Sequence, residues 1–376
     1  NDAIRVDGRE LRCQVIGEGA NLGATQHGRI EYALAGGSLN TDSVDNSAGV
    51  DCSDHEVNIK ILLDSAVAKK KLTGPGRNKV LERMTDEVGE LVLRDNYLQT
   101  QAITMTRSRD TDVLDRQVRF LRMLERAGRL DRAVEFLPDD ETLEERERDK
   151  IGLTRPEIAV VMPYAKLWLY DEILASDLPD ERILQTDLIE YFPTLLRQKY
   201  KNEILGHRLA REIIATVVTN SMINRVGGTF VANLMEKSGA RPVDIARAYI
   251  VVRDTFDLRS IWHDIEALDN KIAASMQVTL LEGVNQLIER ATLWLLRGLV
   301  HPIKIGDAIK EFKPGIEQLK KIIKDAAPDE VIDRVEYRVQ RYVSEGVPTD
   351  LARRVAYLLL LISSFDIVRT ESACRI

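Results

Sequence analysis

Hydrophobic residues recur along most of the chain at the spacing of an α-helix. The clearest example is the stretch 112–130, where four apolar side chains are separated by four, three and three positions: Leu114, Val118, Leu121 and Leu124. This spacing places side chains on one face of a helix. Beyond Lys71 the pattern stays helical between glycine and proline breaks. We therefore expect an all-helical C-terminal domain over residues 66–376, with a candidate break into two subdomains near 139–152.

The first 65 residues have a different pattern. A short, partly β-branched run at 11–16 predicts a strand, and residues 25–35 predict a helix closed by two glycines. Residues 38–42 predict a second strand, and a longer helix follows from near Ser47. Alternation of strand and helix is typical of an α/β sheet. The expected fold is thus mainly α: a short N-terminal α/β (Rossmann-like) fragment, residues 1–65, followed by the helical domain.

Composition narrows the class of protein. The chain is 44% hydrophobic and 30% charged, which fits a folded globular protein. A net charge of −7 gives no general attraction to nucleic acid. Three cysteines are too few for a disulfide framework, so we expect a reducing, cytoplasmic location. The longest apolar stretch has about half of the roughly 20 residues that a bilayer requires, so no membrane partner is expected.

Several features near the N-terminus indicate ligand chemistry and a longer parent chain. The chain opens with Asn1 rather than Met, in a segment typical of the approach to a strand, so we interpret it as a piece of a longer polypeptide. Gly17-x-Gly19-x-x-x-Gly23 has the outline of a dinucleotide fingerprint, although its third glycine is one position late. A turn that needs glycine's positive φ explains the same residues equally well.

A second polar stretch, residues 45–56, leads into an apolar helix. Asn46 or Ser47 can cap that helix, which accounts for one polar residue but not for the others. Ser53 offers a hydroxyl to a carboxylate. The side chains of Asn21 and Asn46 each carry a donor and an acceptor, which matches the carboxamide of a nicotinamide.

Two ordered motifs carry a resemblance to a known family. Residues 18–21 read Glu-Gly-Ala-Asn, and residues 42–56 follow the pattern Asp-x-x-x-Asn-Ala-Gly-Gly-Val-x-x-Ser-x-x-Glu, with Ser47-Ala48 in place of Ala-Gly. Both resemble elements of glutamate dehydrogenases. The sequence of residues 16–63 as a whole is similar to the corresponding stretch of the large bacterial NAD-specific members of that family. This sequence departs from the family at Leu22-Gly23, where Gly-Pro is common, and at Asp54-His55, which replaces an aromatic pair.

The resemblance implies a function and a set of site residues. The family carries out the oxidative deamination of L-glutamate to 2-oxoglutarate and ammonia, with NAD as hydride acceptor. By this resemblance Gly19, Asn21 and Asn46 contact the cofactor, and Ser53 bonds the side-chain carboxylate of glutamate. The family's catalytic lysine and aspartate lie upstream, so no catalytic residue is expected in this chain. A homo-oligomer is also expected.

Other interpretations remain open at this stage. The chain could be a non-enzymatic helical interaction or assembly module, or part of another amino-acid dehydrogenase. The histidines lack metal-ligand spacing, so no metal site is expected. We expect the helical part to serve assembly or regulation, and deletion from about residue 110 in the longer enzyme to change oligomeric state or effector response.

Overall fold

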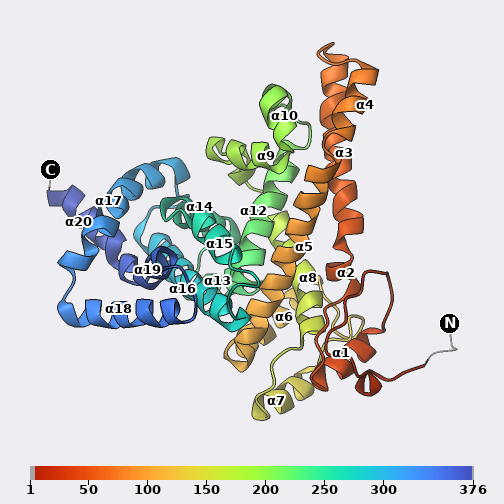
Figure 1. Ribbon diagram of the computed structural model, residues 1–376, viewed down its shortest axis with the longest axis horizontal. Helices are drawn as coiled ribbons and strands as arrows, with labels where there is room; N and C mark the ends of the chain where they lie inside the picture. Colours follow the sequence, from red (N-terminus) through yellow and green to blue (C-terminus); the bar gives the residue numbers. More distant parts are fainter. Residues whose placement is uncertain (1–4, 375–376) are drawn as a thin grey trace. The chain divides into compact units, whose positions relative to one another are not determined.

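The computed structural model describes residues 5–374 (Figure 1). The chain divides into two compact units, Asn1–Thr229 (unit 1) and Phe230–Ile376 (unit 2). Both are built from helices, and each has its own apolar core. The boundary near residue 65 that the sequence suggested stays a prediction.

Unit 1 is organised around a pair of long helices. Helices α3 (Ser47–Ala68) and α5 (Thr85–Ser108) run antiparallel and side by side, joined by α4 (Gly74–Glu82) (Figure 1). Helix α5 also packs against α8 (Arg155–Leu174) and α12 (Ala210–Val226). Fully buried apolar side chains such as Leu63 and Ile103 fill the space between them. This packing places the inner faces of four helices around one region.

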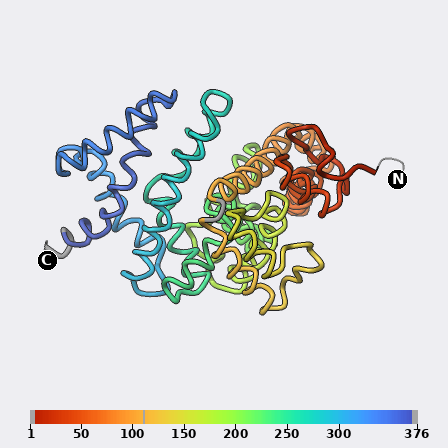
Figure 2. Tube along the Cα trace, turned by 90° about the horizontal axis from the view of Figure 1, so that it is seen from below, coloured from red at the N-terminus to blue at the C-terminus, as the bar shows by residue number. Residues whose placement is uncertain are grey.

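Shorter elements complete unit 1. The N-terminal segment holds η1 (Gly8–Glu10), α1 (Gln26–Leu34) and α2 (Asp42–Asp45), and Figure 2 shows it beside the α3–α5 pair. The remaining elements are η2 (Asp110–Val113), α6 (Leu114–Arg126), α7 (Asp140–Arg148), η3 (Leu178–Asp180), η4 (Arg182–Leu184), α9 (Gln185–Tyr191), α10 (Thr194–Lys199) and α11 (Lys201–Leu205).

Unit 2 surrounds a central helix. Helix α14 (Pro242–Thr255) is buried on nearly every face. It packs against α13 (Phe230–Ser238), α15 (Leu258–Glu266), α16 (Ala274–Gly298) and α17 (Ile305–Ala326). The chain ends with α18 (Asp329–Ser344), α19 (Thr349–Tyr357), η5 (Leu360–Ser363) and α20 (Ser364–Cys374). This burial places α14 at the centre of unit 2, although it carries the buried charged residues Asp244, Arg247 and Arg253.

The prediction of an N-terminal α/β (Rossmann-like) fragment is wrong. Residues 5–374 contain no strand, and the two expected strands meet only in an isolated parallel bridge between Val15 and Ser38. Two hydrogen bonds form it, from Ile16 N to Ser38 O and from Ser38 N to Gln14 O, each 2.9 Å long. The segments then diverge, because the turn at 17–22 begins after one and α2 after the other. A ladder needs further extended neighbours, which the described part of the chain does not supply.

The helix predictions are confirmed. Helix α1 begins after Thr25, whose side chain accepts a hydrogen bond from Gly28 N. Helix α6 buries Leu114, Leu121 and Leu124 of the predicted stripe. None of the described helices combines the length and apolar character needed to span a bilayer.

Candidate functional site

A pocket of about 470 Å³ lies in unit 1 between the N-terminal segment and the inner faces of α3, α5, α8 and α12. Its polar lining consists of four carboxylates, five amides, two hydroxyls and one lysine: Asp42, Asp51, Asp54, Asp95, Asn21, Asn46, Gln99, Asn220, Asn224, Ser43, Ser47 and Lys166. Val50 and Pro163 complete it. Two of the predicted cofactor residues, Asn21 and Asn46, therefore face the same pocket.

Asn46 occupies the N-cap position of α3, yet its side chain does not cap the helix. Its Nδ2 donates to Asn21 Oδ1 at 2.6 Å. Its backbone carbonyl accepts from Gly49 N at 3.1 Å, which closes the first turn. The amide is thus directed at the turn around residue 21 rather than at the helix end.

A buried ion network holds that turn in place. Arg29 donates from Nε and Nη2 to the two carboxylate oxygens of Glu18, each at 2.6 Å, and from Nη2 to Asp42 Oδ1 at 3.1 Å. Asp42 Oδ2 accepts from Leu22 N at 2.9 Å. Asp45 accepts from Glu18 N at 3.0 Å. These bonds fix residues 18–22 against α1 and α2, which directly precede α3.

The pocket holds titratable groups in unusual environments. Burial, and then the nearby Asp95 carboxylate, raises the pKa of Asp51 to about 7. Burial lowers the pKa of Lys166 to about 8, although Asp95 and Asp51 oppose the change. A lysine of this kind exchanges protons near neutral pH. With four aspartates and one lysine, the pocket favours a cationic group.

The other two predicted site residues lie outside this lining. Ser53 is exposed on α3, and Gly19 is exposed in the turn. None of Gly17, Gly19 and Gly23 has a positive φ; the left-handed residue of this turn is Leu22, at φ 57°. A Cβ at position 19 would meet no atom within 4 Å. Backbone strain and packing therefore do not explain the glycine at 19.

Three residues near the pocket escaped prediction from the sequence: Lys166, Asp95 and His55. Lys166 stands in the apolar run of α8, and a single charge in such a run is a signal that was available. Asp51 and His55 are four positions apart, which is also visible in the sequence. Asp95 is brought to them by α5, and nothing in the local pattern reveals that contact.

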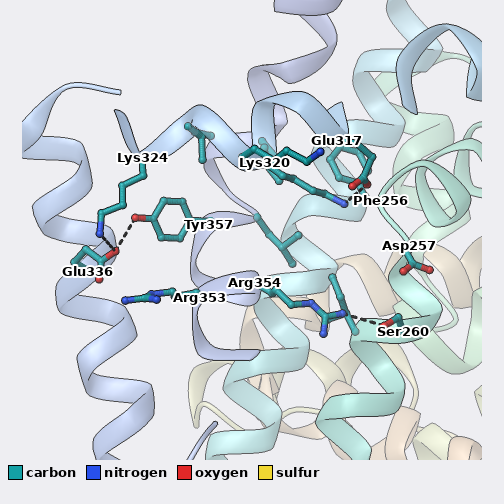
Figure 3. A pocket seen from close by; sticks show the side chains of 15 residues that line it. Phe256, Asp257, Ser260, Glu317, Lys320, Lys324, Glu336, Arg353, Arg354 and Tyr357 are labelled. Atoms are coloured by element: carbon teal, nitrogen blue, oxygen red, sulfur yellow. Dashed lines mark hydrogen bonds and ion pairs between the residues drawn. The ribbon is translucent and has the colours of Figure 1, made fainter. Parts of the chain in front are cut away.

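A second pocket, of about 580 Å³, lies within unit 2 (Figure 3). Five of its lining residues are basic: Lys320, Lys321, Lys324, Arg353 and Arg354. Its acidic residues are Asp257, Glu317 and Glu336. Figure 3 shows Lys324 and the Tyr357 hydroxyl both directed at Glu336, with Tyr357 Oη donating to Glu336 Oε1 at 2.8 Å.

Comparison with known proteins gives two family matches. The family described as "Glutamate dehydrogenase, C-terminal" matches residues 150–376. The family described as "Bacterial NAD-glutamate dehydrogenase, catalytic domain" matches residues 1–106.

Curated relatives match almost the whole chain. Proteins named NAD-specific glutamate dehydrogenase from Halomonas elongata, Pseudomonas aeruginosa and Mycobacterium tuberculosis are 44%, 43% and 39% identical to it. The matches cover 98%, 99% and 98% of this chain. The chain spans 22–23% of the length of these relatives.

Proposed function

The chain belongs to the glutamate dehydrogenase C-terminal family, and from this premise we propose that it works as a segment of an enzyme for the NAD-dependent oxidative deamination of L-glutamate to 2-oxoglutarate and ammonia. The observation that carries the proposal is the Asn21–Asn46 pair at one pocket. Both residues lie in the stretch that matches the bacterial catalytic-domain family. The three relatives named NAD-specific glutamate dehydrogenase also support the proposal.

The pocket lining fits the nicotinamide end of NAD. Asn224 is 3% exposed, and its buried Oδ1 has no hydrogen-bond partner in the described part of the chain. That oxygen can accept from an amide N–H, as a carboxamide offers. In the proposal, Asn21, Asn46 and Asn224 orient the carboxamide, and Gly19 leaves room beside the turn. NAD supplies the hydride acceptor when it is bound.

The charge of the pocket also supports binding of NAD with its nicotinamide end in the pocket. Its four aspartates favour the cationic ring of oxidised nicotinamide and the α-amino group of the substrate. They disfavour phosphate groups, so the pyrophosphate of the cofactor would bind outside this pocket. The residues of this chain therefore bind and orient one end of the cofactor, and no proton-transfer step is assigned to them.

Ser53 is the proposed partner of the side-chain carboxylate of glutamate. Position 53 follows Asn46 by seven residues on α3, which is two helical turns or about 10 Å along the axis. A substrate that meets the cofactor near Asn46 could extend along α3 toward this hydroxyl. The hydroxyl would donate a charge-assisted hydrogen bond to the carboxylate.

Single substitutions in the full-length enzyme test these roles. Asn46→Ala should weaken NADH binding by about 1 kcal/mol, roughly fivefold. Ser53→Ala should raise the KM for glutamate by an amount equivalent to roughly 1–3 kcal/mol while NADH affinity stays unchanged. Fluorescence titration with NADH and steady-state rates measure both. Asn202→Ala, an exposed asparagine outside the pocket, is the matched control and should change neither.

Three results would count against the proposal at different levels. If Asn46→Ala and Ser53→Ala both behave like Asn202→Ala, the assigned site residues are wrong. If the full-length protein reduces NAD faster with leucine or phenylalanine than with glutamate, it is another amino-acid dehydrogenase. If it binds neither NADH nor glutamate, the interaction-module alternative holds.

We also propose a cytoplasmic location and a homo-oligomeric enzyme.

Unit 2 supports a regulatory role for the helical part, which we propose to be the binding of an anionic effector in its basic pocket. Lys320, Lys324 and Arg354 form ion pairs with Glu317, Glu336 and Asp264. No ion pair of Lys321 or Arg353 is present among the described residues, so these two cations remain for a ligand.

Inorganic pyrophosphate is a suitable probe of that pocket. The full-length protein should bind it, and Arg353→Ala should weaken binding by about tenfold or more, because a charge-assisted hydrogen bond contributes about 1.5–3 kcal/mol. Arg119→Ala, in unit 1, is the control. Equal affinity of both variants for pyrophosphate would contradict the effector site.

A further inference from the structure

Three side chains beside the nicotinamide pocket bring candidate metal ligands together. Asp51 and His55 on α3 and Asp95 on α5 each offer one ligand atom, and these atoms all lie within 4.8 Å of one another. Positions 51 and 55 are one turn apart, so their side chains share a face of α3. Helix α5 packs along α3 and supplies the third group. Two rigid helices therefore hold the cluster.

His55 is a buried imidazole whose ring position is fixed. It is 4% exposed, and its ring stacks on that of Tyr191, with centroids 4.6 Å apart and planes at 19°. The Tyr191 hydroxyl in turn accepts from Asn58 Nδ2 at 2.9 Å. Yet His55 Nδ1 is buried and has no hydrogen-bond partner in the part of the chain that the structure describes. A buried polar atom without a partner is costly, which indicates a ligand or ion.

One oxygen of Asp51 shows the same lack of a partner, although the Asp51 carboxyl group also hydrogen-bonds Asp95. Asp51 Oδ2 is buried without a hydrogen-bond partner within the described range 5–374. No ion pair shorter than 4.0 Å joins Asp51 or Asp95 to a cation of the described residues. Two carboxylates this close repel one another unless a proton or a cation lies between them. Lys166 lines the same pocket and is the nearest alternative source of positive charge.

We propose that Asp51, His55 and Asp95 bind one divalent transition-metal ion of the Zn²⁺ class. The imidazole ligand favours such an ion over Mg²⁺ or Ca²⁺, which prefer oxygen ligands alone. Three protein ligands leave a coordination position open, as in zinc sites that bind a further molecule. Asp51 and Asp95 also line the pocket, so the proposed metal site lies at its wall. The sequence predicted no metal site, so the proposal departs from that expectation.

Metal titration of the full-length protein tests the proposal directly. Isothermal titration with Zn²⁺ should show one ion bound per chain at this site, and Co²⁺ at the same site should give visible absorption bands from tetrahedral coordination. His55→Gln and Asp95→Asn should each raise the Kd for Zn²⁺ by more than about 100-fold, since loss of an outer partner alone costs up to about that much. His263→Gln, an exposed histidine of unit 2, should leave the Kd unchanged.

Lys166→Met gives a second, independent readout. Removal of a cation from the pocket should lower the Kd for Zn²⁺, whereas it should leave binding elsewhere on the protein unaffected. Circular dichroism of each variant shows whether it has folded, and Asp95→Asn keeps the test valid if His55→Gln does not fold. The proposal is overturned if Zn²⁺ does not bind, or if it binds equally to wild type and to both ligand variants. In those cases a shared proton and Lys166 balance the two carboxylates.

Discussion

Single side chains in the N-terminal segment make contacts that their local sequence does not reveal. Asn46 stands where a helix cap is expected, but its amide bonds Asn21 across 25 positions of the chain. Asp42 likewise accepts from Leu22 N, 20 positions earlier in the chain, as well as from Ser43 N of the helix that it begins. The motif nominated Asn21 and Asn46 from the sequence. It did not include Asp95, which tertiary packing alone brings to the pocket, or Lys166, whose one sequence signal is its charge within the apolar run of α8.

The Glu18–Arg29 pair is the ionic centre of the turn, with side chains 4% and 7% exposed. Arg29→Met should lower the free energy of unfolding by roughly 3–5 kcal/mol, because it leaves Glu18 buried without its charge partner. Denaturant titration measures the change. Lys60→Met breaks the exposed Glu56–Lys60 pair and should cost less than about 1 kcal/mol. Equal costs for the two variants would contradict this account of the network.

Asp42 makes the stability of the turn dependent on pH. The hydrogen bond from Leu22 N, and then the charge of Arg29, hold the pKa of Asp42 below its ordinary value despite its partial burial. A lowered pKa in the folded state means that the ionised carboxylate stabilises the fold above the unfolded pKa of about 4. This contribution is lost as the pH falls through the lower, folded value.

The free energy of unfolding, measured from pH 6 downward, should therefore fall more steeply in wild type than in Asp42→Asn. Asp139→Asn is not a suitable control, because the pKa of Asp139 is also lowered, by its bonds to Thr142. Asp64→Asn, in an exposed pair with Arg77, serves instead. A wild-type profile parallel to that of Asp42→Asn would be inconsistent with the role of this carboxylate.

At the scale of elements, the sequence predicted helices well and strands poorly. Helix α6 follows from the apolar spacing at 112–130, and α1 and α3 lie where residues 25–35 and the stretch from near Ser47 predicted helices, because each depends on residues close together in the chain. A strand depends on partners elsewhere. The run at 11–16 has the composition of a strand, yet it finds one bridging residue and continues into a turn. The same limit explains why the α/β fragment was predicted and is not observed.

The start of α8 offers a test of a local signal. Thr154 and Glu157 form a capping box, in which Glu157 Oε2 accepts from both Thr154 N and Thr154 Oγ1 at 2.7 Å. Thr154→Ala should lower the free energy of unfolding by about 0.5–2 kcal/mol. Thr216→Ala, at an exposed position within α12, is the control and should change it by less than about 0.5 kcal/mol. Thermal and denaturant unfolding of the two variants measure the difference.

At the scale of the whole molecule, the division into two units changes how the helical part should be studied. Deletion from about residue 110, which the sequence suggested, would remove α8 and α12 and so break the packing of α5 in unit 1. The division at Thr229 and Phe230 leaves the elements of each unit together. A truncation at that point tests the role of unit 2 without removing the walls of the pocket in unit 1.

An enzyme from which residues 230–376 have been deleted should therefore differ from the full-length enzyme in oligomeric state or in its response to pyrophosphate. The response should be lost because the basic pocket lies within the deleted residues. Analytical ultracentrifugation and pyrophosphate titration measure the two properties. Truncation at residue 110 should instead yield protein that does not fold, as circular dichroism would show. If removal of residues 230–376 leaves both the oligomeric state and the pyrophosphate response unchanged, unit 2 serves neither purpose.

The hydrogen bond between Asn46 Nδ2 and Asn21 Oδ1 has a thermodynamic consequence for any molecule that these amides recognise. An incoming carboxamide that bonds these same two atoms competes with their internal partner and gains only the difference between the two contacts. Recognition at this position is an exchange reaction. The affinity for the ligand therefore depends on how readily residues 18–22 move away from the start of α3. A substitution that destabilises the turn should lower the Kd of the ligand.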